Sequence, residues 1–310
     1  MGRRDVVGVR LMPKVKYVDI DIGSARRSVI DKANEIIAEY SAQGFDLTLR
    51  QLYYQFVSRG LLPNKQLEYK KLGDVINDGR LAGLIDWYSI VDRTRNLRGL
   101  NHWTSPSEIV AACAQQYRRD KWETQSFYVE VWIEKDALVG VIESICGELD
   151  VPFFSCRGYT SQSEMWSAAQ RLIRKTEERS LDGSIIVHLG DHDPSGIDMS
   201  RDIQDRLRLF RTNTEVRRIA LTMEQVRQYN PPPNPAKLTD SRCEKYVAQY
   251  GNESWELDAL EPRVLADLIH AEVSTFVDDR KRRLTQKQED TEKRQLKKVS
   301  ARWAEIANEL

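Results

Sequence analysis

Two aspartates lie two positions apart where an apolar run ends. The run from Ile185 to Leu189 has the pattern of a buried strand, and it stops at Gly190. Asp191 and Asp193 follow, and Pro194 ends the extended segment. Two close carboxylates repel each other unless a cation lies between them or one takes a proton. The pattern therefore indicates a Mg²⁺ site, with Mn²⁺ as a substitute, although a solvated Asp-Pro turn explains the pair equally well at this point.

A third carboxylate, Glu134, occupies the same kind of position farther up the chain. It follows the run Phe127 to Ile133, which is rich in aromatic and β-branched residues and predicts a strand. The carboxyl ends of strands in an open parallel sheet form one edge, which is the usual ligand side. We therefore expect Glu134, Asp191 and Asp193 to converge on a single metal ion.

Arg50 and Tyr54 form a second candidate site. They lie four residues apart on the predicted helix from Thr48 to Ser58, so their side chains share a face. A free phenol has a pKa of about 10 and attacks poorly at neutral pH. A neighbouring guanidinium favours the phenolate and can also bind a phosphate through two hydrogen bonds. Helical spacing places Tyr53 in the core, whereas Tyr54 lies one step round the helix and need not be buried.

The first part of the chain predicts a small helical domain. Helices are expected at 24–40, 48–58 and 66–77, and the stretch 84–99 can form the strands and loop of a wing. We expect a mostly α winged-helix domain over residues 1–120, in which 105–119 forms a connecting helix. The basic residues predicted to contact DNA, in the third helix and the wing, are Lys70, Lys71, Arg80, Arg93, Arg95 and Arg98.

The middle of the chain alternates between strands and helices. Strands are expected at 127–133, 151–156, 184–190 and 216–221, with helices at 137–149, 163–179 and 197–210. This alternation predicts an α/β domain over residues 121–280, built on a parallel sheet covered by helices. Helices near 240–250 and 262–277 follow, with the segment Trp255 to Leu260 between them. Residues 281–310 predict a charged C-terminal helix.

These motifs together resemble a known family. The segments VWIEKDA (131–137) and HLGDHDPSG (188–196) are similar to the Toprim domain, the Mg²⁺-binding module of topoisomerases, primases and some nucleases. RQLYY (50–54) resembles the Arg-x-x-aromatic-Tyr motif of the topoisomerase VI A subunit and its meiotic double-strand-break relatives. The resemblance covers roughly residues 24–277. It implies that Tyr54 attacks a DNA phosphate to form a 5′-phosphotyrosyl link, and that Arg50 stabilises the developing charge.

The resemblance also implies partners. One chain offers one such tyrosine, so a double-strand break requires two chains, and we expect a homodimer on double-stranded DNA. In the resembling family the tyrosine of one protomer meets the metal of the other. The chain is shorter than a full-length A subunit and contains nothing like the ATPase subunit of a type IIB topoisomerase. Strand cleavage is therefore implied, strand passage is not, and a separate ATPase subunit is a further partner that the resemblance allows.

Composition favours a DNA-associated protein of the cytoplasm. Lys plus Arg and Asp plus Glu both total 47, yet residues 1–120 carry 19 basic and 14 acidic residues. Residues 121–280 carry 19 and 28, and residues 281–310 carry 9 and 5, so the charges are unevenly distributed. The four cysteines are scattered without metal-site spacing, which suggests reduced thiols. The sequence has neither a signal-peptide core nor an apolar run long enough for a membrane helix.

Two other functions stay open at the level of sequence. In a Toprim nuclease a metal-activated water would cut the DNA, and Tyr54 would be structural only. In a non-catalytic DNA-binding subunit the acidic site would be degenerate, which the intact Glu134, Asp191 and Asp193 argue against. The sequence gives neither a DNA sequence preference nor a biological setting such as phage, plasmid, defence or repair.

Overall fold

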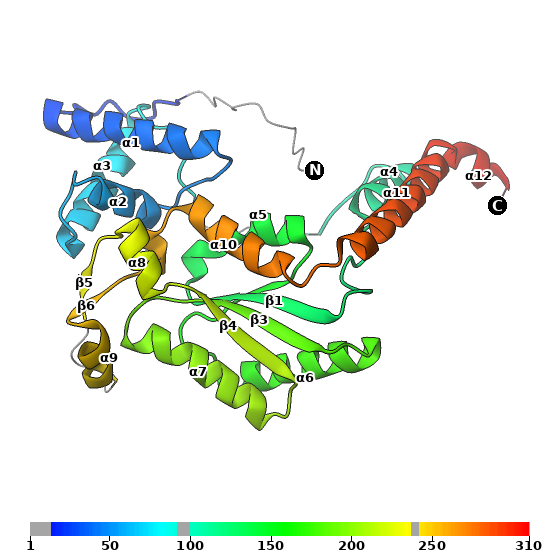
Figure 1. Cartoon of the computed structure of the whole chain (residues 1–310). Coiled ribbons are helices and arrows are strands. Elements are labelled where there is room, and N and C mark those ends of the chain that lie inside the picture. Colours follow the sequence, from blue (N-terminus) through cyan, green and yellow to red (C-terminus); the bar gives the residue numbers. More distant parts are fainter. Residues whose placement is uncertain (1–13, 92–99, 237–241, 310) are drawn as a thin grey trace.

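The fold combines a parallel sheet, a group of N-terminal helices and a projecting helical arm (Figure 1). The computed structural model describes residues 14–91, 100–236 and 242–309. The four-stranded sheet has the order β2-β1-β3-β4, and all its strands are parallel. Its strands are β1 (Phe127–Ile133), β2 (Phe153–Ser155), β3 (Gly183–Leu189) and β4 (Thr214–Ala220). The predicted parallel sheet is therefore confirmed.

Helices cover both faces of the sheet, as the alternating sequence predicts (Figure 1). One face carries α5 (Val139–Leu149) and α10 (Pro262–Ser274), and the other carries α6 (Gln162–Arg179) and α7 (Pro194–Leu209). Successive residues of a strand point to opposite faces. Val129, Val131 and Ile133 accordingly pack under α5 and α10, while Tyr128 and Trp132 pack under α6 and α7.

Three helices form the N-terminal part, with a separate hydrophobic core. They are α1 (Ser24–Ala42), α2 (Leu49–Ser58) and α3 (Gln66–Leu81). Thr48 and Gln51 form a reciprocal capping box that fixes the start of α2, because each side chain satisfies a backbone amide of the other residue. The core joins residues from all three helices, including Ile30, Leu52 and Ile76.

The wing predicted over 84–99 is not confirmed. Residues 84–91 contain no strand, and a single parallel bridge joins Leu47 to Ile90. The rest of the predicted wing, with Arg93, Arg95 and Arg98, lies outside the described residues. The N-terminal part is therefore described here as a three-helix unit.

Short elements connect the sheet to the N-terminal helices. They are α8 (Met223–Tyr229), α9 (Cys243–Tyr250), the two-residue strands β5 (Asn234–Pro235) and β6 (Glu253–Ser254), and the 3₁₀ turns at Asp136–Leu138 and Leu257–Ala259. Ala259 packs into the core of the N-terminal helices, whereas Leu257 and Leu260 pack into the core under α10. The segment between Trp255 and Leu260 is thus shared by both parts of the protein.

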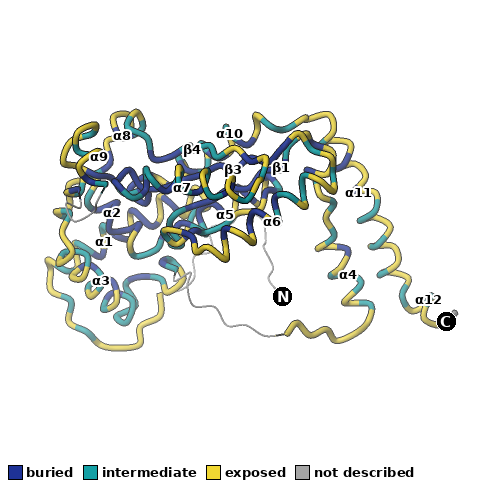
Figure 2. Tube along the Cα trace, turned by 90° about the horizontal axis from the view of Figure 1, so that it is seen from below, coloured by how far each residue is buried: buried dark blue, intermediate teal, exposed yellow. Residues whose placement is uncertain are grey.

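A helical arm projects from the sheet (Figures 1 and 2). It consists of α4 (Pro106–Gln116), α11 (Asp279–Ala301) and α12 (Trp303–Glu309). The predicted connecting helix α4 lies beside α11, where Ser300 Oγ donates to the carbonyl of Ser107 at 3.2 Å. Just beyond α4, the buried Glu289 accepts from the backbone amide of Arg119 at 2.9 Å. Among the described residues, the helices are all too short or too polar to cross a membrane.

A buried ion pair beneath α6 provides a test of the sheet packing. Glu130 of β1 is 2% exposed, and its carboxylate accepts from Arg171 at 2.8 and 3.0 Å and from Trp132 Nε1 at 2.8 Å. We expect Arg171→Ala to lower the free energy of unfolding by roughly 2–4 kcal/mol, because it leaves a buried carboxylate without its cation. Urea denaturation measures this loss.

The matched control for this prediction is Arg174→Ala on the same helix. Arg174 is exposed and lies 4.0 Å from Glu178, so its removal should change stability by less than about 0.5 kcal/mol. Equal losses in the two variants would show that the Glu130 pair contributes nothing specific.

Candidate functional site

The ends of β1 and β3 are joined through Glu134. Its backbone amide donates to the carbonyl of Leu189 at 2.9 Å, which extends the strand pairing by one residue. Its carboxylate then turns to the next loop and accepts from the amide of Asp191 at 2.9 Å. Gly190 lies between, and a Cβ at this position would come within 2.9 Å of Glu134 Oε2. The predicted convergence of Glu134 with Asp191 at one sheet edge is thus present.

Asp193 begins α7 and serves as its N-cap. Its Oδ1 accepts from the amide of Gly196 at 2.6 Å, which satisfies an amide that the helix leaves unpaired, and from Ser195 Oγ at 3.0 Å. The turn is very tight, since a Cβ on Gly196 would lie 2.3 Å from the carbonyl oxygen of Asp191. Asp191 and Asp193 are 7% and 8% exposed, so the pair is buried and is not a solvated Asp-Pro turn.

The electrostatics of this edge disfavour ionised carboxylates. Burial raises the pKa of Glu134, and the nearby charge of Asp193 adds to the effect. Burial also raises the pKa of Asp191 to about 8; Lys135 opposes this rise, while Glu134 and Asp258 reinforce it. A cation bound between these oxygens would relieve the repulsion.

Arg218 of β4 supports the same loop, a role that the sequence does not reveal. Its guanidinium donates to the carbonyls of Gly190 (3.0 Å), Asp191 (2.6 Å) and Gly196 (2.8 Å). Burial lowers its pKa, although the surrounding carboxylates oppose that shift. An arginine inside the strand-like run TEVRRIA is the only sequence signal, and it does not distinguish Arg218 from Arg217, which pairs with the peripheral Glu215 and Glu272.

A second acidic pair, Glu256 and Asp258, lies against this edge. His192 and Trp255 form a short antiparallel bridge with backbone hydrogen bonds of 2.8 and 2.9 Å, which brings the following residues to the sheet. The amide of Leu257 then donates to Asp191 Oδ1 at 2.8 Å. Sequence reasoning missed this pair, because strand and helix periodicity assign no role to a loop between helices.

Lys135 lies among three carboxylates. Its ammonium is 2.8 Å from Glu256 Oε2, 2.8 Å from Asp258 Oδ1 and 3.2 Å from Asp191 Oδ1. The Asp258 side chain is fully buried, and that of Lys135 is 18% exposed. Burial opposes its charge, but these carboxylates keep the pKa of Lys135 above its usual value.

Arg50 contacts the same two carboxylates from the side of α2. Its Nε is 2.9 Å from Asp258 Oδ2, and a terminal nitrogen is 2.5 Å from Glu256 Oε2. Together with Lys135 and Asp191, these residues form what we call the interdomain network. Burial works against ionisation of Glu256, yet Lys135 and Arg50 hold its pKa well below the usual range. The network therefore links the two sites that the sequence predicts separately.

Tyr54 lies next to this network but is buried. It is 4% exposed, a burial that its helical spacing left open. The Arg50 guanidinium lies 5.8 Å from its ring centre. Burial raises the pKa of Tyr54 well above the usual value, Asp258 and Glu256 raise it further, and Arg50 opposes them only in part. The predicted activation by Arg50 is thus outweighed in this arrangement.

Tyr53 is a core residue, as predicted. It is 4% exposed, and its hydroxyl accepts from the amide of Lys65 at 2.8 Å and donates to the carbonyl of Pro63 at 3.3 Å. It therefore fixes the turn between α2 and α3. Tyr53 is a close structural match to Tyr54, and its hydroxyl bonds residues 63–65 of this turn.

The two histidines of this region are packed and are not arranged as metal ligands. His192 Nδ1 lies 2.8 Å from Tyr246 Oη, within a group of aromatic rings. His188 is fully buried, with Nδ1 2.8 Å from Ser200 Oγ. Burial lowers the pKa of His192 to about 4 and that of His188 to about 3, so both are neutral at physiological pH.

The residues predicted to contact DNA fall into three groups. Lys70 is exposed on α3, and Lys71 is exposed but paired with Glu68 at 2.8 Å. Arg80 has a structural role, because it donates to the backbone carbonyls of Ile90 at 2.5 Å and Trp87 at 3.1 Å. Burial also lowers its pKa. The remaining three are the arginines outside the described residues.

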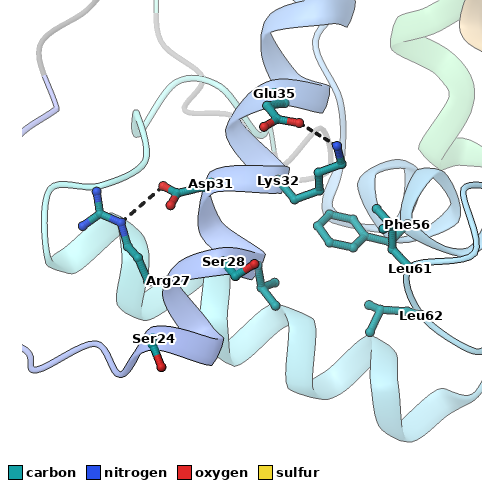
Figure 3. Close-up of a pocket in the computed structure, with 10 residues that line it drawn as sticks. Ser24, Arg27, Ser28, Asp31, Lys32, Glu35, Phe56, Leu61 and Leu62 are labelled. Carbon is teal, nitrogen blue, oxygen red and sulfur yellow. Dashed lines mark hydrogen bonds and ion pairs between the residues drawn. The ribbon is translucent and has the colours of Figure 1, made fainter.

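A hollow of about 520 Å³ lies away from this site, between α1 and the end of α2 (Figure 3). Arg27 pairs with Asp31 at 3.2 Å and Lys32 with Glu35 at 2.6 Å along its rim. Phe56, exposed Leu61 and Leu62 form its apolar side. None of the predicted site residues lines it, and its charges are already paired with each other.

The carboxylate oxygens at this edge are the type of ligand that a hard divalent ion prefers, but they are not grouped closely around one point. Glu134, Asp191 and Asp193 supply carboxylate oxygens at one edge, where burial raises the pKa values of Glu134 and Asp191. Within the described ranges, however, no three His, Cys, Asp or Glu side chains are grouped closely enough to hold a metal. Comparison with protein-family models and with curated proteins finds no match.

Asp191→Asn provides a test of the electrostatics. A pKa raised in the folded state means that the folded protein binds more protons than the unfolded chain, so Asp191 lowers stability as the pH rises from about 4 to about 8. Without metal, we expect Asp191→Asn to be roughly 1–2 kcal/mol more stable than the wild type at about pH 8, and the gain to shrink at about pH 5. Urea denaturation in EDTA at the two pH values measures this difference.

The same variants report on metal binding. Calorimetric titration with Mg²⁺ or Mn²⁺ should show weaker binding in Asp191→Asn and Glu134→Gln than in the wild type. Asp205→Asn, an exposed charge-matched change on α7, should behave like the wild type in both assays. Unchanged metal affinity in both site variants would remove these carboxylates from a metal site.

Proposed function

We propose that the protein cleaves DNA strands by transesterification, with Tyr54 as the nucleophile. The observation that carries the proposal is the interdomain network, in which Glu256 and Asp258 bind Arg50 on one side and Lys135 on the other. A tyrosine-guanidinium pair and a buried acidic edge therefore lie within one set of contacts, although they are far apart in sequence. The resemblance to the topoisomerase VI A subunit supports the same assignment.

The residues suggest a division of roles. Attack of the Tyr54 oxygen on a backbone phosphorus would form the 5′-phosphotyrosyl bond and break the bond to the 3′-oxygen. Arg50 would bind the phosphate, in place of the carboxylates that now occupy its donors. Glu134, Asp191 and Asp193 would hold Mg²⁺, which supplies Lewis-acid stabilisation of the phosphate charge. Lys135 would keep Glu256 and Asp258 in place beside them.

The arrangement described here is a closed state in this proposal. Tyr54 is buried against carboxylates that raise its pKa, so it must leave them before it reacts. A DNA phosphate provides the competing anion, because it can take the donors of Arg50 and separate α2 from Glu256 and Asp258. We propose that DNA binding itself opens the site.

The proposal extends to domains and partners. The three-helix unit would act as a winged-helix-like DNA-binding domain, and the α/β part as a Toprim-like metal-binding domain. The protein would work as a homodimer on double-stranded DNA in the cytoplasm, and a separate ATPase subunit would be needed for strand passage.

A Toprim nuclease is the second candidate, and one observation favours it. Burial and two carboxylates hold the pKa of Tyr54 high, which suits a structural tyrosine. In that case a metal-activated water would cut the strand and no protein would be joined to DNA. A non-catalytic DNA-binding subunit would neither cut the strand nor become joined to DNA.

Tyr54→Phe distinguishes these functions. Reactions with end-labelled duplex and Mg²⁺, stopped with denaturant, should leave wild-type protein covalently attached to the 5′ end of the cut. We expect Tyr54→Phe to fold and bind DNA but to leave no covalent product, because it lacks the attacking oxygen. Gel separation of protein-linked and free DNA measures the result.

Tyr53→Phe is the matched control. It removes the neighbouring hydroxyl, which bonds only the α2–α3 turn, and should retain covalent product at a stability cost of about 1 kcal/mol. Cleavage without covalent product in the wild type and at an equal rate in Tyr54→Phe would establish the nuclease instead.

Mixing two inactive variants tests the shared active site of the proposed homodimer. With shared sites, a heterodimer of Tyr54→Phe and Glu134→Gln has one complete site, formed by the intact tyrosine of one chain and the intact acidic edge of the other. We expect it to nick one strand of a supercoiled plasmid, which agarose gel electrophoresis detects.

The interdomain network provides the alternative, in which each active site is contained within one chain. It joins Tyr54 to the acidic edge of its own chain, so self-contained sites would leave both sites of the heterodimer defective and the plasmid intact. Each variant alone serves as the control and should not nick. A protein that sediments as a monomer with and without DNA would exclude the dimer.

A further inference from the structure

The long helix α11 carries five basic side chains along one face. Arg280, Arg283, Lys287, Arg294 and Lys298 recur at spacings of three, four and seven residues, which places them in one stripe of an α-helix. All five are exposed. We call this set the α11 stripe. It extends over 18 residue steps, or about 27 Å at 1.5 Å per residue.

Two acidic residues of α11 lie off this face, whereas exposed Asp290 lies between Lys287 and Arg294, where it accepts from Gln286 at 2.9 Å. Glu289 and Glu292 point to the opposite side, where they accept from the amide of Arg119 and from the hydroxyl of Tyr117 beyond the end of α4. Glu289 also pairs with Lys293 at 2.6 Å. Among the described residues, no carboxylate forms an ion pair with any side chain of the α11 stripe. The stripe thus carries five cationic side chains and one carboxylate, and the face on the opposite side of α11 packs against residues 117–119.

The arm holds the stripe at the edge of the molecule. Figures 1 and 2 show α4, α11 and α12 projecting from the sheet, on the side away from α1, α2 and α3. Packing against α4 orients α11, so the stripe is a fixed surface. A partner that touches both the stripe and Tyr54 must be extended, since the sheet domain lies between them.

We propose that the α11 stripe binds the phosphate backbone of duplex DNA that flanks the cleavage site. Regularly spaced phosphates on a long rigid duplex match a straight row of arginine and lysine side chains, and arginine binds phosphate through two hydrogen bonds. The contact carries no base readout, because a row of backbone-binding cations on a helix face reads charge and not sequence. The choice of DNA as the polyanion rests on the proposed function, whereas the cationic surface does not.

Salt dependence of DNA binding tests this surface. Each phosphate contact adds about 0.9 to the slope of log affinity against log salt concentration. We expect a variant with all five stripe residues changed to Gln to lose up to about 4 from that slope, and to bind duplex at least about tenfold more weakly near physiological salt. Fluorescence anisotropy of labelled duplex in EDTA measures binding without cleavage.

A second five-residue variant controls for net charge. It changes exposed arginines on other helices to Gln, namely Arg174, Arg201, Arg208, Arg227 and Arg263. This variant should keep most of the wild-type slope. If the full stripe variant does not fold, Arg283→Gln with Lys287→Gln should still lower the slope by about 2.

Three results would overturn the proposal. They are a wild-type slope in the stripe variant, an equal loss in both five-residue variants, and loss of binding to phosphatidylserine vesicles with duplex binding unchanged. The outcome is independent of Tyr54, because a reduced slope without covalent product would support the stripe and reject the transesterase. Covalent product with an unchanged slope would support the transesterase and reject the role of the α11 stripe.

Discussion

The contact between Lys135 and three carboxylates is the constraint on which the rest of the site depends. Asp191 and Asp258 are buried and the side chain of Glu256 is 27% exposed, and without a cation their charges would repel one another. Lys135 occurs directly after Glu134, so the end of β1 supplies both an acid and the counter-ion for the loop opposite. Arg50 adds a second cation from another part of the chain. Arg50, Lys135, Glu256 and Asp258, which come from three distant segments, are thereby held in contact, and this holds the N-terminal helices against the carboxyl edge of the sheet.

That constraint also determines what Tyr54 can do. Burial raises the pKa of Tyr54 and the carboxylates that neutralise Arg50 raise it further, so the contact that stabilises the interface also disfavours the phenolate. A phosphate that replaces Glu256 at Arg50 would change both properties together. The ionic contact at Arg50 would therefore stabilise the interface only while Tyr54 stays protonated and buried.

The sheet and its helices follow from the sequence because each element has a local signal. The runs at Phe127 to Ile133 and Ile185 to Leu189 are short and apolar, as expected of buried strands, and both strands form within one or two residues of the predicted bounds. Glu134, Asp191 and Asp193 could be located for the same reason. Glu256, Asp258 and Arg218 could not, because their positions depend on long-range pairing: His192 with Trp255 places the first two, and the register of β4 beside β3 places Arg218. Burial of Tyr54 is a further failure of local reasoning, since a helix that packs on two sides buries residues outside its main apolar stripe.

The even charge balance of the chain acquires a physical meaning from these contacts. The acidic excess of residues 121–280 is drawn partly into the protein, where Lys135, Arg50 and Arg171 neutralise buried carboxylates. The basic excess of α11, nine Lys and Arg against four Asp and Glu, has no such internal partner on its outer face. A protein with zero net charge can therefore present a cationic surface, because the two signs differ in how deeply they are buried. An anionic polymer would be attracted locally, within the screening length of about 8–10 Å, and the total charge would not oppose it.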